Sequence, residues 1–381
     1  MTRNESNRQS KPPRRVAIVH DWLIGGGAER VVFELHKMFP EAPIYTSYCN
    51  DEWRERLDGK VTTGFLQHWP FGKLRKYVGL LRIWWFGHLD LSGYDLVISS
   101  SGNGEAFGVK PPKTATHICY CHTPTHYYWR HYDQYMANPG FGAFNWLARL
   151  GLRSLVGPLR RWDYKAAQRV DYFIANSTHI QADIKQYYGR ESVVVAPPID
   201  VDRFKASMPM KDRTAFITVG RQVPAKHTEL IVEACTKLGL PLEVIGNGPE
   251  HEKLVAIAGP TVKFFTRLSD KAVAEHMGCA QAFLFASFDD AGVTPREAMA
   301  AGTPVIAYRA GGALDYVVEN ETGLFFEEQT AEALIAVLKK FNPEKFKPSV
   351  VRNKALDSSS EAFRKHIQDF IDQISSDSRH S

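Results

Sequence analysis

The chain has 381 residues, 44% of them hydrophobic and 23% charged, a composition that excludes a disordered or fibrous protein and is typical of a globular one. Its length allows two domains with separate cores. No apolar run approaches the roughly 18 residues of a membrane-spanning helix, and the polar, basic N-terminus does not resemble a signal peptide, so we expect a cytoplasmic protein.

The net charge of +5 is unevenly distributed. Residues 1–203 carry 26 Lys and Arg against 19 Asp and Glu, a net +7, whereas residues 204–381 carry 21 against 23, a net −2. We expect the basic half to face an acidic partner, either nucleic acid or an anionic membrane. Five cysteines, an odd number, lie mostly in apolar runs and are expected to be reduced; their spacing predicts no metal site.

The first half of the chain predicts a βα series. After a disordered head at residues 1–14, an apolar strand at 15–20 leads through a glycine turn into a helix at 28–38. Further strands are predicted at 44–48, 95–99, 116–120, 172–175 and 192–196. Residues 15–205 are therefore expected to form one doubly wound α/β domain.

A second βα series follows a polar stretch at 206–213 that reads as a linker. Its strands are predicted at 215–219, 242–245, 262–265, 282–286 and 304–307. Residues 206–357 are therefore expected to form a second doubly wound domain. An amphipathic helix at about 358–376 ends the predicted structure.

The most informative segment is 287–307, which places two carboxylates, Asp289 and Glu297, eight residues apart around a loop that leads into a helix. Thr294 is predicted as the N-cap and Pro295 as the first helical residue, so free N–H groups and the positive end of the helix dipole lie between the acids. Such an end attracts phosphate. A diphosphate flanked by acceptors for hydroxyls describes a sugar nucleotide; the alternative is an ordinary αβ unit whose helix begins after Thr-Pro.

This pattern resembles the retaining glycosyltransferases of family 4, whose signature is a Glu, seven residues and a second Glu. Thr294-Pro295, the run 297–306 and Gly311-Gly312 stand where that family has them, while Asp289 replaces the first Glu. The resemblance implies the GT-B fold, two Rossmann-like doubly wound domains facing across a cleft. It places the acceptor on the first domain and the nucleotide sugar on the second, with the C-terminal helix packing back on the first.

The resemblance also gives roles to the two acids. Glu297 is expected to accept hydrogen bonds from ribose hydroxyls. Asp289 is one methylene shorter than the usual Glu, so its reach toward the sugar hydroxyls is open, and Asp290 is a possible substitute. Both acids could instead serve only as residues that favour the helix dipole.

Two cations follow the first strand of the second domain. Arg221 and Lys226 match the family's Gly-Arg-x-x-x-x-Lys pattern, and we expect them to neutralise charge on the leaving diphosphate. The alternative is a solvated pair of cations on a surface loop. Glycine loops and neighbouring segments are expected to contact the donor nucleotide; their residues are Gly25, Gly26, Gly27, Gly246, Asn247, Gly248, Arg267, Leu268, Val293 and Thr294.

Two of these expectations leave an ordinary structural reading open. The turn Gly25–Gly27 is about as well explained by tight backbone geometry as by a phosphate. His122, which follows a predicted strand in a His-Thr-Pro context, is expected to position the donor sugar or relay a proton. The alternative for His122 is a hydrogen-bonded histidine at a strand end.

Two segments of the basic half, 69–86 and 144–162, interleave cations with aromatic and aliphatic residues, an interfacial composition. In the second, Arg149, Arg153 and Arg160 fall on one helical stripe. We expect peripheral binding to the inner face of the cell membrane, with amphipathic core helices as the alternative. Nucleic acid is disfavoured because no RNA-binding motif accompanies the aromatic residues.

Taken together, the residues and the resemblance predict a retaining, metal-independent hexosyltransferase that needs no cofactor. The donor is expected to be GDP-mannose, with a UDP-sugar next, and the acceptor a lipid-linked or polysaccharide glycan of the cell surface. Two rival interpretations remain: a catalytically silent nucleotide-sugar-binding protein, motivated by Asp289, and a GT-B sugar-nucleotide epimerase.

Overall fold

A computed structural model describes residues 14–75, 78–130, 132–137, 139, 142–204 and 209–377. The predicted head, apart from Arg14, and part of the predicted linker lie outside these residues. The chain divides into two compact units. The first consists of residues 1–25, 35–120 and 125–173, and the second of residues 26–34, 121–124 and 174–381.

The first sheet has seven strands in the order β3-β2-β1-β4-β5-β6-β7. Its strands are β1 (Val16–His20), β2 (Ile44–Thr46), β3 (Val61–Thr63), β4 (Leu96–Ser101), β5 (Thr116–Cys121), β6 (Tyr172–Ala175) and β7 (Ser192–Val194). The pairings of β1 with β2 and β4, and of β2 with β3, are parallel. Strand β3 was not predicted.

The helices that follow these strands begin and end where local chemistry favours it. Their bounds are α1 (Ala28–Met38), α2 (Asp51–Arg56), α3 (Phe71–Leu74), α4 (Gly79–Phe86), α5 (Tyr132–Ala137), α6 (Asn145–Ala167) and α7 (Thr178–Tyr188). The side chain of Asn50 caps α2 and that of Ser177 caps α7. Helix α7 ends at Gly189, whose φ of 64° lies in the left-handed region that glycine adopts at little cost.

The second sheet has six strands in the order β10-β9-β8-β11-β12-β13. They are β8 (Phe216–Val219), β9 (Leu242–Ile245), β10 (Val262–Phe265), β11 (Ala282–Phe285), β12 (Val305–Tyr308) and β13 (Gly323–Phe326). Strand β13 was not predicted. Because strand side chains alternate between faces, Ile217 and Phe283 pack in one core cluster while Phe216 and Leu284 pack in another, so the sheet is buried on both faces.

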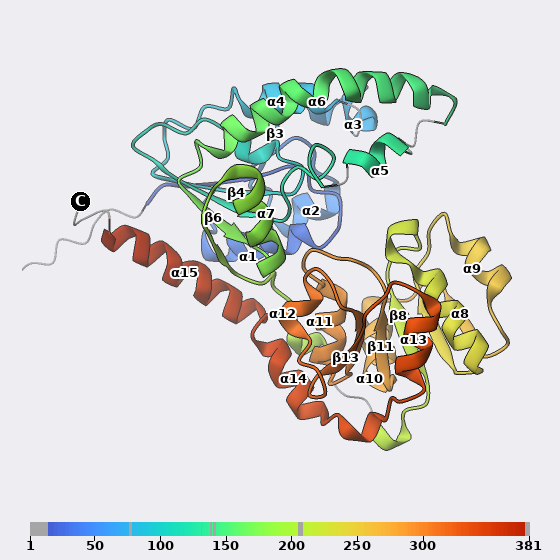
Figure 1. The fold of residues 1–381 in the computed structure, drawn as a ribbon. Coiled ribbons are helices and arrows are strands. Elements are labelled where there is room, and N and C mark those ends of the chain that lie inside the picture. The colour runs from blue at the N-terminus through green and yellow to red at the C-terminus, as the bar shows by residue number, and fades with distance from the viewer. Residues whose placement is uncertain are drawn as a thin grey trace, which may run out of the picture. The chain divides into compact units, whose positions relative to one another are not determined.

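Helices cover both faces of the second sheet (Figure 1). Their bounds are α8 (Thr228–Leu238), α9 (His251–Ile257), α10 (Asp270–Cys279), α11 (Val293–Ala300), α12 (Ala313–Tyr316), α13 (Ala331–Leu338), α14 (Pro348–Leu356) and α15 (Ser360–Asp377). Helices α8 and α13 lie on one face, and α10, α11 and α14 on the other. Phe363, Ile367, Ile371 and Ile374 form the buried stripe of α15. The amphipathic pattern predicted this stripe with Phe370 in the place of Ile371, but Phe370 is half-buried.

Each sheet has the doubly wound strand order in which the chain reverses direction at a switch point, between β1 and β4 in the first sheet and between β8 and β11 in the second. Ligands of open α/β sheets bind in the crevice outside the carboxyl ends of the strands at this point. Both sheets were predicted, and their strand order directs attention to the residues that follow these four strands.

At the switch point of the first sheet, the carboxylate of Asp21 accepts hydrogen bonds from the backbone of the loop that follows β4. Asp21 follows β1, is 2% exposed, and accepts hydrogen bonds from the N–H groups of Gly102, Asn103 and Ala106 at 2.7 to 2.9 Å. The hydroxyl of Ser101 also donates to it. This carboxylate therefore fixes the loop that follows β4.

The same loop is tied to α4 by a buried ion pair. Arg82 Nη2 donates to Glu105 Oε1 at 2.7 Å, and both side chains are at most 5% exposed. Burial raises the pKa of Glu105 to about 7, while the Arg82 guanidinium opposes the rise.

Trp85 and Phe86, on the same helix as Arg82, are buried as well. The interfacial reading of 69–86 is therefore wrong for Arg82, Trp85 and Phe86, which belong to the core; Trp69 and Trp84 are exposed.

All five cysteines are free, and all but Cys279 are buried. No helix among the described residues is long and apolar enough to cross a bilayer.

Candidate functional site

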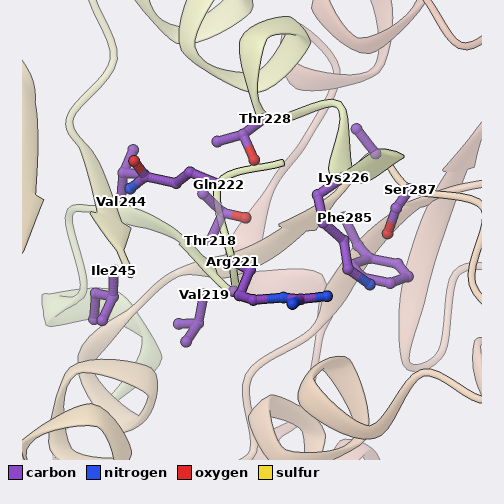
Figure 2. A pocket seen from close by; sticks show the side chains of 12 residues that line it. Thr218, Val219, Arg221, Gln222, Lys226, Thr228, Val244, Ile245, Phe285 and Ser287 are labelled. Atoms are coloured by element: carbon purple, nitrogen blue, oxygen red, sulfur yellow. The ribbon is translucent and has the colours of Figure 1, made fainter. Parts of the chain in front are cut away.

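A small pocket lies at the switch point of the second sheet (Figure 2). Its cavity volume is about 20 Å³, enough for about one water-sized group. The lining residues come from the carboxyl ends of β8, β9 and β11 and the loops that follow them: Thr218, Val219, Gly220, Arg221, Gln222, Lys226, Thr228, Val244, Ile245, Phe285, Ala286 and Ser287. Two of the five residues predicted to be catalytic, Arg221 and Lys226, line it.

The local sequence explains how the two cations are presented. Strand β8 ends at Val219, and a 3₁₀ turn from Pro224 to Lys226 precedes α8. Proline fits the first position of this turn because it lacks only an N–H that has no partner there. Arg221 is exposed and makes no ion pair within the described part of the chain, so its guanidinium is available to an anion. Figure 2 shows it extending along the pocket.

Lys226 is joined to Asp289, the first acid of the predicted pair. Lys226 Nζ lies 2.5 Å from Asp289 Oδ2, and it also lies 5.7 Å from the centre of the Phe285 ring. Burial by itself would raise the pKa of Asp289, but the Lys226 ammonium and the N–H groups of Ala291 and Gly292 outweigh it and hold that pKa below its usual value. Asp289 is therefore a carboxylate at neutral pH, bound to a cation at the edge of the pocket.

The backbone around Asp289 is tightly packed. A Cβ on Gly311 would lie 2.5 Å from the Asp289 carbonyl oxygen, and Gly312 donates its N–H to that oxygen at 2.8 Å. A Cβ on Gly292 would lie 2.4 Å from the Tyr316 ring. The neighbouring carboxylate, Asp290, lies 4.0 Å from His179 Nε2. The glycines that carried the family resemblance thus have a packing reason.

The predicted start of the helix after this loop is wrong. Helix α11 begins at Val293, and its N-cap is Gly292 with a φ of 65°, so Thr294 and Pro295 lie inside the first turn. The reason is that glycine reaches the left-handed region at little cost, so the helix begins two residues earlier than a Thr294 N-cap would require. Val293 and Thr294, both expected to contact the nucleotide, are half-buried in this first turn.

Glu297, the second acid, is buried and held by two guanidinium groups. Its Oε1 accepts from Arg30 Nη1 at 2.5 Å and from Arg203 Nη2 at 3.2 Å. Arg203 also pairs with Asp270 at 3.0 Å. Sequence reasoning missed both arginines, because 267 and 94 residues separate them from Glu297. The expected contact of Glu297 with a ribose stays a prediction.

The glycine loop after β9 has a packing reason of its own, and its expected contact with the nucleotide stays a prediction. A Cβ on Gly246 would lie 2.0 Å from the Gly220 carbonyl oxygen, and one on Gly248 would lie 2.2 Å from that of Gln222. Gln222, which is buried, also donates from Nε2 to the Gly246 carbonyl. These glycines are required because two loops of the site touch through their backbones. Asn247 is exposed between them.

The remaining predicted residues are more scattered. Arg267 is exposed after β10, while Leu268 packs against the core. Gly25 has a φ of 113°, so the turn before α1 needs glycine there. His122 follows β5 and is half-buried, and its carbonyl accepts from Asn176 Nδ2 at 2.8 Å. The roles expected for these residues stay predictions.

Comparison with known families covers most of the chain. Residues 25–203 match the model described as Glycosyltransferase Family 4, and residues 199–357 match the model described as Glycosyl transferases group 1. A GDP-mannose-dependent alpha-mannosyltransferase of Mycolicibacterium smegmatis is 34% identical over 110 residues, 29% of each chain. A D-inositol 3-phosphate glycosyltransferase of Geodermatophilus obscurus is 28% identical over 208 residues, 44% of this chain and 45% of that relative. The chain thus matches less than half the length of these curated relatives.

Solved structures resemble the whole fold. Sucrose-phosphate synthase of Thermosynechococcus elongatus matches with a TM-score of 0.70 and 17% identity, over 95% of this chain and 100% of that one. Anabaena HepE, solved with UDP and glucose, matches with a TM-score of 0.66 and 16% identity, over 94% and 100%. At such identities the likeness shows the fold alone. With two Rossmann-like α/β sheets and both family matches, the chain has the GT-B fold and belongs to glycosyltransferase family 4.

Proposed function

We propose that the protein is a retaining, metal-independent glycosyltransferase that moves a hexose, mannose first, from a nucleoside diphosphate sugar to a glycan acceptor. The observation that carries the proposal is the pocket at the second switch point, where the guanidinium of Arg221 has no ion-pair partner among the described residues and Lys226 lies beside it. A nucleoside diphosphate presents the charge that this pair would neutralise.

The chemistry follows from where charge develops during transfer. As the glycosidic bond to the donor breaks, negative charge accumulates on the leaving diphosphate, and fixed cations stabilise it. Arg221 and Lys226 supply two positive charges there. Asp289 holds the Lys226 ammonium in place. In a retaining transfer without a protein nucleophile, the acceptor hydroxyl attacks the same face that the diphosphate leaves and passes its proton to the diphosphate.

The donor is inferred from relatives. The mannosyltransferase of M. smegmatis is named as dependent on GDP-mannose, and Anabaena HepE was solved with UDP. We therefore favour GDP-mannose, with a UDP-sugar next. A thermal-shift panel of GDP, UDP and ADP distinguishes them, because a nucleotide at about 100 times its Kd stabilises the folded state by about 2.7 kcal/mol.

The acceptor is inferred to be a lipid-linked or polysaccharide glycan of the cell surface, reached at an anionic membrane. The support is the face of α6 in the first unit, where Trp146 is 64% exposed and Leu147 and Leu150 more than half exposed. The cations Arg153 and Arg161 are exposed on the same helix. Aromatic and basic residues together on one helix suit a membrane interface.

Not every arginine of the predicted stripe is available to a membrane. Arg149 donates to the carbonyls of Met136 and Ala137 at the end of α5. Arg160 donates to the Tyr128 carbonyl and lies over the Trp129 ring at 5.2 Å. Arg149 and Arg160 therefore donate hydrogen bonds to the backbone of neighbouring segments. Of the three arginines in the predicted stripe, Arg153 is left to contact a membrane.

The decisive experiment is turnover of the donor. Purified protein is incubated with GDP-mannose or UDP-glucose and a panel of lipid-linked acceptors, and both the released nucleoside diphosphate and the glycosylated product are measured. Release of nucleotide with matching product supports the proposal. A donor that is bound but stays intact with every acceptor would favour the silent binding protein.

A further inference from the structure

A serine hydroxyl in the pocket has no partner. Ser287 follows β11, is 1% exposed, and its Oγ is buried without a hydrogen bond to any described residue. It lines the same pocket as Arg221 and Lys226 (Figure 2). A buried hydroxyl left unpaired is unfavourable by about 1–3 kcal/mol, so a ligand in the pocket that accepts a hydrogen bond from Ser287 would remove this cost.

The surroundings of the pocket select the chemistry of that ligand. The lysine ammonium and the arginine guanidinium are donors only, and neither can accept a hydrogen bond. A group that contacts Ser287 and also these two cations must therefore be an acceptor, and a negatively charged oxygen satisfies all three. The cavity of about 20 Å³ has room for about one such oxygen.

We propose that Ser287 is a donor-binding residue whose hydroxyl donates a hydrogen bond to one phosphate oxygen of the nucleoside diphosphate held by Arg221 and Lys226. The inference rests on the proposed function and adds a residue and an atom to it. Nothing in the Gly-Arg-x-x-x-x-Lys pattern or the pair of acids indicates this serine.

The unpaired state of the hydroxyl gives the variant Ser287→Ala an unusual signature. Removing an unpaired buried hydroxyl leaves the ligand-free protein as stable as the wild type or slightly more stable, since no hydrogen bond is lost. Removing a donor to a charged oxygen weakens ligand binding by about tenfold or more. A serine that supported only the fold would show the opposite combination, a lower Tm with unchanged affinity.

The chain offers a matched control. Ser192 Oγ, at the start of β7, is also buried without a hydrogen bond to a described residue, and it lies outside the residues that line the pocket. Ser192→Ala is therefore the same chemical change in the same structural unit. It is expected to leave both Tm and nucleotide affinity at wild-type values.

The test is calorimetric titration of the full chain with GDP, UDP and inorganic pyrophosphate, with Tm measured for every variant. The inference is supported if Ser287→Ala keeps its Tm and binds the preferred nucleotide and pyrophosphate at least about tenfold more weakly, while Ser192→Ala does not. Wild-type affinity in Ser287→Ala overturns it. So does a loss for the nucleotide without a loss for pyrophosphate, because the hydroxyl would then contact another part of the ligand.

Two further outcomes are separable. If wild-type protein binds none of the three probes, the proposed function itself fails, and Ser287 falls with it. If Ser287→Ala does not fold, Ser287→Cys takes its place, because it keeps the side chain's shape but has a weaker hydrogen-bond donor. It is expected to bind the nucleotide more weakly than the wild type. Wild-type affinity in Ser287→Cys then counts against the inference.

Discussion

The charged residues predicted for the site differ in whether they form an ion pair within the protein. Arg221 has no ion pair among the described residues, whereas Lys226 is joined to Asp289 at 2.5 Å and Glu297 to Arg30 at 2.5 Å. The sequence motif predicts which residues belong to the site, but it does not predict the residues with which they form ion pairs. Partners are set by tertiary distance, and Arg30 lies 267 residues from Glu297. The motif could therefore predict Glu297 but not the cations that hold it.

At this scale we expect Lys226→Ala to reduce transfer by about 100-fold or more, because it removes a cation from the leaving diphosphate. Initial rates of product formation measure the effect. Lys237→Ala is the matched control, since Lys237 is an exposed lysine of α8 that pairs with Glu332 at the surface. Equal rates in the two variants would contradict the assignment.

Glu297→Ala is a separate prediction for the second acid. We expect transfer to fall by a similar factor, because the variant removes the acceptor proposed for the ribose hydroxyls and leaves Arg30 and Arg203 without their shared partner. The fold should persist, as circular dichroism would show. A variant with near-normal rates would remove Glu297 from the site.

Elements were predicted better than their ends. Runs of apolar residues identified β1, β6 and β9, because a buried parallel strand reads as a short hydrophobic run. Strands β3 and β13 were not predicted. Helix α11 begins at Val293 rather than after Thr294, because Gly292 supplies a left-handed N-cap. Periodicity gives the existence of an element, while cap geometry and edge pairing decide its limits.

The contact between two loops is a testable property at this scale. We expect Gly248→Ala to lower the free energy of unfolding by about 1–3 kcal/mol, because its Cβ would lie 2.2 Å from the Gln222 carbonyl oxygen and force the loops apart. Gly220→Ala is the control in the neighbouring loop, since a Cβ there meets no atom within 4 Å. Urea denaturation compares the two; equal stabilities would show that the loops are free to separate.

The tie between α4 and the loop after β4 predicts a pH dependence. Arg82→Met leaves the Glu105 carboxylate buried without its cation, which destabilises by about 3–5 kcal/mol. A raised pKa means that the folded state binds an extra proton between the unfolded value of 4.5 and the folded value of about 7. Stability from this group is therefore complete below pH 4.5 and is lost as pH rises through 7.

Without Arg82 the pKa of Glu105 rises further, so the loss in Arg82→Met is expected to be larger at pH 8 than at pH 5. Guanidinium denaturation at both values measures it. An equal loss at the two pH values would mean that removing Arg82 does not change the pKa of Glu105 in the folded state.

For the whole molecule, composition predicted a globular protein and the charge distribution predicted an acidic partner. Neither could predict which cations lie on the surface. The basic first half suggested an acidic partner, yet some of its cations are used within the protein: Arg82 is buried against Glu105, and Arg149, which is exposed, caps α5. A count of charges cannot separate these from Arg153, which is exposed on α6. Only the fold shows which part of the positive charge is available to a membrane.

The corresponding prediction concerns liposome flotation. Wild-type protein is expected to float with vesicles containing anionic lipid, less so at high salt, and Trp146→Glu is expected to weaken this by removing an aromatic residue from the interface. Val255→Glu is the control, because Val255 is 48% exposed on α9 in the second unit. Flotation that is absent, or that both variants reduce equally, would assign the α6 face another role.

The two sheets share one strand order, but their switch points are not equivalent. In the first sheet the carboxylate of Asp21 already takes the N–H groups of Gly102, Asn103 and Ala106, as a bound anion would. A phosphate arriving there would meet a resident negative charge and no vacant donor among these three groups. The fold is thus duplicated while its anion site is not: in the first sheet a carboxylate of the protein takes the place of an anionic ligand, and the second sheet carries the pocket for which we propose a substrate.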